Sequence, residues 1–170
     1  MPLRFVWVSH YAEESLDEVK RVIKEYKPEV IGLELDEAGL EKLKRYRKRE
    51  GSELYYGYQY AKRAGATLLL TDQDKKKQMD QALKMLGSLG LLKLGLLFSV
   101  KNLGRLFTGQ RLRKLKVDDS QILRQHVLVN RDKEFIKQIR DAQARFKGKR
   151  LLFIFGRAHK PGIVKGLKPA

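Results

Sequence analysis

Four short apolar runs, separated by amphipathic helical segments, constrain the fold of this 170-residue chain most strongly. The runs cover residues 3–8, 30–35, 67–70 and 151–155. Short buried strands that alternate with helices are typical of βαβ units, whose strands pair in parallel. The sequence therefore predicts an α/β fold. It has a small, mostly parallel central sheet of about four strands, flanked by helices, in a single domain over residues 1–170.

Local signals place the helices between these strands. Ser15-Leu16-Asp17-Glu18 reads as a capping box that begins the first helix. Asp36 is a suitable cap for the second, and Gly65 ends a third over residues 54–64. Asp118 and Asp119 begin more helix, and Asn130 is expected to cap a separate long helix after it.

The positive charge of the chain is concentrated in one segment. The net charge is +17, and residues 75–116 hold eleven Lys or Arg and a single acid, Asp80. This segment is also rich in Leu and Gly, so we expect an inserted basic helical hairpin over about residues 75–117. Its residues 85–107 suit an anionic membrane surface better than nucleic acid, because few aromatic side chains are available for stacking. Packing of the hairpin on the core is the third alternative.

Composition excludes several classes of protein. The chain has no cysteine, which excludes a disulfide scaffold, thiolate-bound zinc and a cysteine nucleophile. It has neither a secretory signal pattern nor an apolar run of the ~18 residues that a spanning helix needs. We therefore expect a cytoplasmic protein, or one held peripherally at a membrane.

Polar residues follow each predicted strand. His10 follows the first, Glu34 lies near the end of the second, Asp72 follows the third, and His159 follows the fourth. Because ligands of open parallel sheets bind beyond the carboxyl ends of the strands, these residues form the candidate site. The remaining histidine, His126, lies among apolar neighbours and reads as structural.

Two imidazoles and a carboxylate suit either a divalent metal or general acid–base catalysis. A structural alternative remains for Glu34, because a carboxylate in an apolar strand must be paired, here with Arg131 or Arg157. Asp72 also has a structural alternative as a helix cap. Arg131 at a helix start opposes the helix dipole, so we expect it to pair with Glu34 or to bind an anionic substrate group.

Several motifs resemble the TraB/PrgY pheromone-shutdown family. They are the region of His10 with residues 27–36 (KPEVIGLELD), residues 65–74 (GATLLLTDQD), residues 128–132 (LVNRD) and residues 155–163 (FGRAHKPGI). The chain departs from the family pattern at Trp7, where the family has glycine, and at Gln73, where it has arginine. We also expect it to lack the membrane-spanning C-terminal region of many relatives.

The resemblance implies a site and an activity. The family is grouped with Tiki proteases, haem-binding ChaN-like proteins and erythromycin-esterase-like hydrolases, which share two histidines, a glutamate and an arginine. Carried over by position, these are His10, His159, Glu34 and Arg131 as catalytic residues. His10, Glu34 and His159 would hold a divalent ion such as Mn²⁺, Co²⁺ or Zn²⁺. The neighbouring polar residues Asp36, Asp72 and Arg157 are expected to bind substrate.

Three function classes follow. The first is a metal-dependent hydrolase that acts on a peptide or a small ester. The second is a non-catalytic module that sequesters a peptide, metal or small acidic ligand and docks on a membrane or partner through the basic hairpin. The third is nucleic-acid binding through the positive surface. A homodimer is compatible with each of them.

Overall fold

The structure, a computed structural model, describes residues 2–9, 12–45, 52–72 and 118–168, with the backbone alone for residues 118–127. The chain divides into two compact units, Met1–Asp74 with Leu128–Ala170, and Lys75–Val127. The fold below is that of the first unit. The predicted hairpin over residues 75–117, together with His10, Gln73 and the His126 side chain, lies outside the described residues.

The core of the fold is a four-stranded, all-parallel sheet, so the predicted α/β class is confirmed. Its strands are β1 (Leu3–Val8), β2 (Val30–Leu33), β3 (Thr67–Leu70) and β4 (Leu151–Gly156), in the spatial order β1-β4-β2-β3. The central strands β2 and β4 are buried along their whole length. This burial explains their continuous apolar sequence, because helices cover both faces of the sheet.

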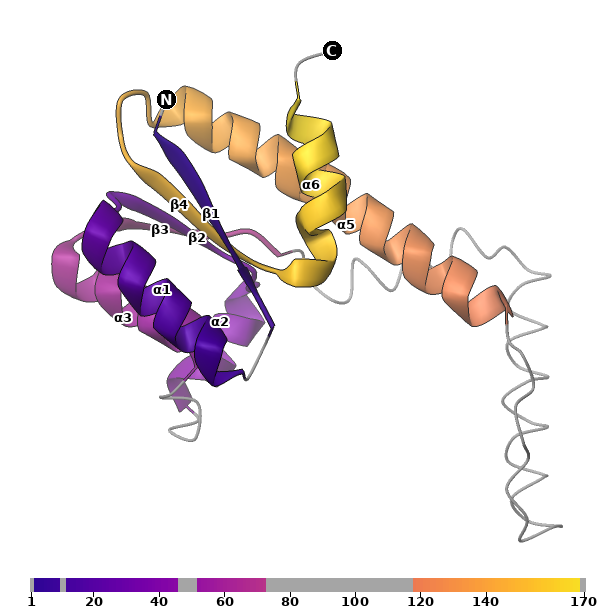
Figure 1. Cartoon of the computed structure of the whole chain (residues 1–170), viewed down its shortest axis with the longest axis horizontal. Coiled ribbons are helices and arrows are strands. Elements are labelled where there is room, and N and C mark those ends of the chain that lie inside the picture. The colour runs from indigo at the N-terminus through magenta and orange to yellow at the C-terminus, as the bar shows by residue number, and fades with distance from the viewer. Residues whose placement is uncertain (1, 10–11, 46–51, 73–117, 169–170) are drawn as a thin grey trace, which may run out of the picture. The chain divides into compact units, whose positions relative to one another are not determined.

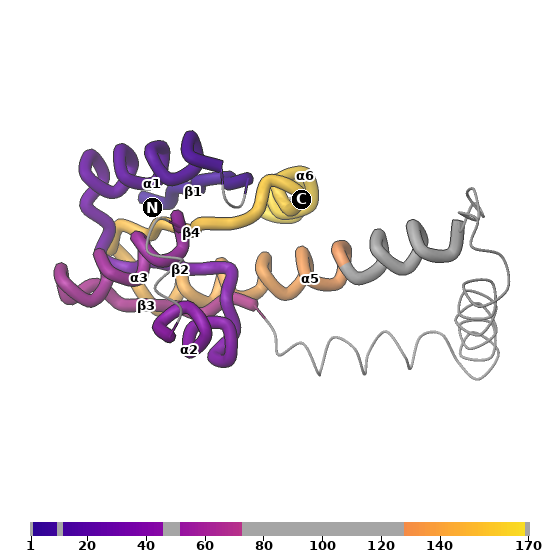
Figure 2. The backbone as a smooth tube through the Cα atoms, turned by 90° about the horizontal axis from the view of Figure 1, so that it is seen from below, coloured from indigo at the N-terminus to yellow at the C-terminus, as the bar shows by residue number. Residues whose placement is uncertain are grey.

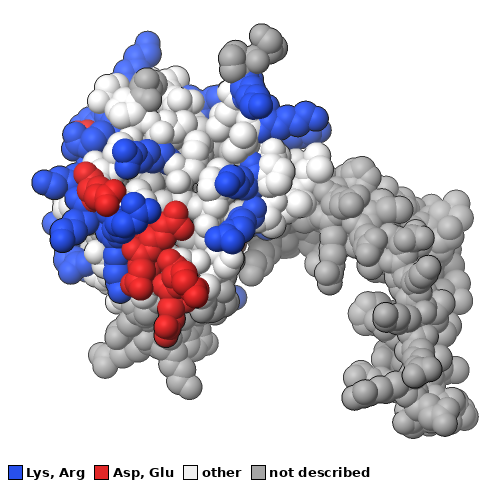
Figure 3. Space-filling view, viewed as in Figure 1, with Lys and Arg blue, Asp and Glu red and all other residues white. Residues whose placement is uncertain are grey.

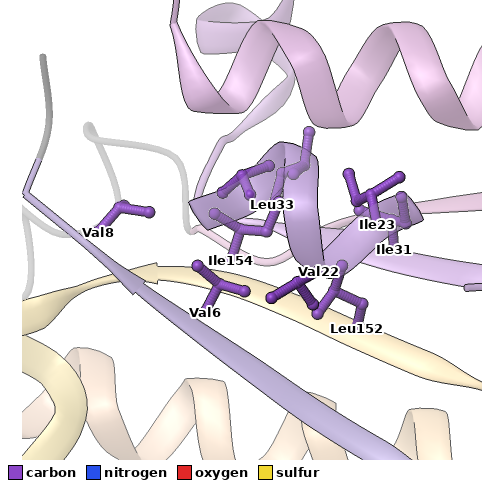
Figure 4. Packing of buried hydrophobic residues seen from close by; sticks show 9 residues of the cluster. Val6, Val8, Val22, Ile23, Ile31, Leu33, Leu152 and Ile154 are labelled. Carbon is purple, nitrogen blue, oxygen red and sulfur yellow. The ribbon is translucent and has the colours of Figure 1, made fainter. Parts of the chain in front are cut away.

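Helices pack on both faces of the sheet (Figures 1 and 2). Side chains of α1 (Glu13–Tyr26) and α3 (Glu53–Ala64) pack on one face, and those of α5 (Asp118–Arg145) and α6 (Lys160–Leu167) pack on the other. Alternate residues of β4 supply the two cores: Leu152 and Ile154 face α1, while Phe153 and Phe155 face α5. Figure 4 shows the first of these cores.

The remaining elements follow directly after strands. Helix α2 (Glu37–Arg45) begins after β2, and the Asp36 carboxylate caps it by accepting a hydrogen bond from the Gly39 N–H at 2.6 Å, as predicted. Strand β4 leads into a single 3₁₀ turn, η2 (Arg157–His159), and then into α6. None of the helices in the described ranges combines the length and the hydropathy that a membrane-spanning segment needs.

Two of the predicted helix starts are wrong. Helix α1 begins at Glu13, so Ser15 lies inside its first turn. The buried Ser15 hydroxyl instead bonds back to Ser9, accepting from its N–H at 2.9 Å and donating to its carbonyl at 3.0 Å. Helix α5 continues through Asn130 without a break, so Asn130 lies inside the helix and not at its start. In both cases the tertiary environment outweighs a local capping signal.

Candidate functional site

The carboxyl ends of β2, β3 and β4 meet at one edge of the sheet, as parallel pairing requires. Glu34 directly follows β2, Asp72 lies two residues after β3, and His159 ends the turn after β4. The predicted strand over residues 30–35 is too long, since β2 ends at Leu33, and the Glu34 N–H makes a last hydrogen bond to the Ile154 carbonyl of β4 at 3.3 Å. Helix α5 crosses this edge and brings Arg131 into the same cluster.

Arg131 links two of the strand ends through one nitrogen. Its Nη2 donates to Glu34 Oε1 at 2.7 Å and to Asp72 Oδ2 at 3.0 Å. The side chains of Arg131, Glu34 and Asp72 are 22%, 8% and 13% exposed, so these ion pairs are largely shielded from water. Of the two arginines that the sequence offered to Glu34, the structure therefore selects Arg131, and Arg157 is exposed.

The Glu34 carboxylate is held in its ionised form. Burial raises its pKa, but hydrogen bonds from His159 and from the Gly156 N–H, with the charges of His159 and Arg131, lower it to about 2. The Gly156 N–H donates to Glu34 Oε2 at 2.6 Å. A carboxylate with so low a pKa is a weak base at neutral pH, and it is well suited to bind a cation.

His159 lies between two carboxylates. Its Nδ1 is 2.5 Å from Asp132 Oδ1, and its Nε2 is 3.3 Å from Glu34 Oε1. The imidazole is 4% exposed, and it packs edge-on against the ring of Phe135 at a centroid distance of 4.9 Å. Burial lowers the pKa of His159, but hydrogen bonds to Glu34 and Asp132 raise it above the ordinary value of 6.5.

Asp132 is the member of the cluster to which the sequence assigned no role. Its side chain is 9% exposed, and burial raises its pKa, partly offset by the hydrogen bond and charge of His159. Its spacing from Phe135, Ile136 and Ile139 places a carboxylate on the buried stripe of α5, and this was the signal available in the sequence.

Gly162 makes room for the Asp132 carboxylate where α6 crosses α5. A Cβ atom at position 162 would overlap Asp132 Oδ2. A glycine at this point of the FGRAHKPGI segment therefore lets α6 approach closely enough for the Asp132–His159 contact.

The other predicted site residues differ in their surroundings. The hydrogen bond described for the Asp36 carboxylate caps α2, and Arg157 is exposed on the turn after β4. Trp7 packs on the aromatic rings of Phe5 and Phe155, on the sheet face that α5 covers. The Trp7 indole is thus partly buried against the core on this face.

Two described donors, Glu34 and His159, have the spacing of ligands to one divalent ion. Asp132 holds Nδ1 of His159, and a carboxylate on one imidazole nitrogen is the usual partner of a histidine that binds metal through the other. The 3.3 Å between Nε2 and Glu34 Oε1 suits two ligands that each lie ~2.0–2.2 Å from one ion. The third predicted ligand, His10, is not described, and the described residues alone contain no group of three metal-binding side chains.

A separate shallow hollow of about 180 Å³ lies between β3 and the end of α5, with Leu69, Arg145 and Phe146 in its lining. This lining contains none of the five charged residues of the cluster, which are Glu34, Asp72, Arg131, Asp132 and His159. The chain matches no family model, no curated protein and no solved structure in the comparisons made with each.

Proposed function

We propose that this chain is a divalent-metal-dependent hydrolase that acts on peptide or small ester bonds. One observation carries the proposal: Asp132, His159 and Glu34 form a buried chain of contacts at 2.5 and 3.3 Å, at the carboxyl edge of a parallel sheet. A structural ion pair needs only Glu34 and Arg131. The Asp132–His159 pair adds an oriented imidazole, which is the arrangement found around catalytic metals and catalytic histidines.

Each residue then has a defined task. Glu34 and His159, with His10, would hold the ion, which when bound supplies an activated water. Asp132 fixes the orientation of the His159 ring through Nδ1. Arg131 positions the Glu34 carboxylate and Asp72. The Arg131 guanidinium, whose side chain is 22% exposed, would also steady a negative charge on the substrate.

A binding module is the second candidate, and one feature favours it. The charged side chains of the cluster are only 4–22% exposed and pair with one another, as expected for a site that retains a ligand without turning it over. In this role the same residues would sequester a metal or a small acidic ligand.

Hydrolysis of a panel of chromogenic esters and short peptides, with added Mn²⁺, Co²⁺ or Zn²⁺, separates the two candidates. We expect His159→Ala to remove the activity and Asp132→Asn to lower it roughly 10–100-fold, because the ring loses its orientation. His126→Ala is the matched control and should retain activity. Full activity of folded His159→Ala would exclude this site, and an inactive wild type with every metal would favour the binding module.

A further inference from the structure

Helix α5 carries a stripe of basic residues along one side. Lys133, Lys137 and Arg140 are all exposed, and their spacing places them on a common face of α5, while the exposed Lys147 follows in the turn after the helix. At 1.5 Å per residue the helical part of the stripe, from residue 133 to residue 140, is about 10 Å long. The core-facing side of α5, with Phe135 and Ile139, lies elsewhere on the helix, so these cations take no part in packing the sheet.

Helix α6 extends this basic surface. Helix α6 packs on α5 through Gly166, where a Cβ atom would overlap the Ile136 side chain. Arg140 Nη2 also donates to the Gly166 carbonyl at 2.8 Å. The opposite side of α6 is exposed. It carries Lys160 and Lys165 beside Val164, which is 42% exposed, and the exposed Lys168 follows as the C-cap residue of the helix. We call these seven cations, together with Val164, the α5–α6 face.

Acidic residues are nearly absent from this part of the chain. Residues 128–168 contain twelve Lys or Arg and three acids. Asp132 is buried against His159, Glu134 bonds Gln138 at 3.5 Å, and Asp141 lines the hollow beside β3. The acids are instead numerous in residues 2–72. Figure 3 shows acidic side chains gathered on the α1 and α2 side, while the surface around α6 shows Lys and Arg only.

We propose that the α5–α6 face docks on an anionic lipid bilayer. Lysine-rich surfaces are attracted to anionic headgroups without specific pairing, and an exposed aliphatic side chain such as Val164 can enter the headgroup boundary. Six of the seven cations are lysines, which act as point charges. The face offers no aromatic side chain and a single arginine, so it lacks the stacking and bidentate groups that favour nucleic acid.

Docking through this face is independent of the proposed hydrolysis and of the predicted contact through residues 85–107. It also leaves the charged cluster unchanged, because the seven cations have no contact with Glu34 or His159 among the contacts described. The proposal can therefore fail while the proposed function stands, and the reverse also holds.

Co-sedimentation of the full chain with vesicles tests the proposal. The vesicles are phosphatidylcholine with about 30% phosphatidylglycerol, and pure phosphatidylcholine is the reference. Each lysine removed from the interface should weaken partitioning about fivefold, so Lys133→Gln/Lys137→Gln/Lys165→Gln should lose roughly 100-fold at low salt. An unchanged thermal midpoint and circular dichroism spectrum show that this variant is folded.

A second triple variant provides the matched control. Lys20→Gln/Lys24→Gln/Lys62→Gln removes the same charge from exposed positions on α1 and α3, which cover the other face of the sheet. We expect it to bind the anionic vesicles within about fivefold of wild type. Equal loss in both variants, or wild-type binding by the α5–α6 variant, would overturn the proposal. So would a wild type that binds a DNA duplex but neither kind of vesicle.

Discussion

Replacing Arg131 with methionine is expected to lower the free energy of unfolding by about 3–5 kcal/mol, because it removes the arginine that pairs with two shielded carboxylates. Arg131 is the only described partner that joins Glu34 to Asp72, and both carboxylates are at least 87% shielded from solvent. Methionine keeps most of the aliphatic stem and loses the guanidinium, whose Cζ lies 5.4 Å from the centre of the Phe135 ring, so the loss reports on charge more than on packing.

Urea unfolding of the two arginine variants provides the measurement. Arg157→Met is the control, since Arg157 is exposed and the sequence offered it equally as the partner of Glu34. It should change stability by less than about 0.5 kcal/mol. Adding Glu34→Gln to Arg131→Met should recover part of the loss, because one uncompensated charge is removed. Equal stability of Arg131→Met and Arg157→Met would contradict the described ion pairs.

Glu34→Gln is expected to change the response of the fold to acid. The folded pKa of Glu34 is about 2, below its ordinary value of 4.5. The ionised carboxylate therefore contributes stability above pH 4.5, and this contribution of about 3 kcal/mol is lost as the pH falls toward 2. The stability difference between wild type and Glu34→Gln should shrink by about that amount over this range.

This experiment is made with a chelator present, and Glu41→Gln is its control. Glu41 also has a lowered pKa, owing first to its hydrogen bond from Lys44, but this pair is exposed. The stability difference between wild type and Glu41→Gln should therefore change much less with pH. The raised pKa of His159 acts in the opposite direction. Its contribution is complete below about pH 6.5 and is lost as the pH rises through the folded value. If the stability difference between wild type and Glu34→Gln did not change with pH, the described surroundings of the Glu34 carboxylate would be contradicted.

Much of this fold is predictable from sequence, because strand patterning and strand ends obey simple rules. The alternation of apolar runs and helices predicts a parallel sheet, and parallel pairing then brings Glu34, Asp72 and His159 to one edge. The pairing of Glu34 with Arg131 was also anticipated, although from a helix start at Asn130 that does not exist.

The remaining features depend on packing that no local pattern encodes. The Ser15 hydroxyl forms hydrogen bonds with the Ser9 backbone and does not cap α1, because the chain between β1 and α1 brings the two residues together. Asp132 acquires its role because Gly162 lets α6 approach α5, which brings His159 to the carboxylate. Contacts between helices distant in sequence cannot be read from spacing along one helix.

The most direct measurement is the metal content of untagged protein after incubation with Mn²⁺, Co²⁺ or Zn²⁺ and desalting. We expect about one ion per chain in wild type and in His126→Ala, and none in folded His159→Ala or His10→Ala/His159→Ala, because those variants lose a ligand. Wild-type metal content in His159→Ala, or no metal in the wild type with any of the three ions, would contradict a metal site at Glu34 and His159.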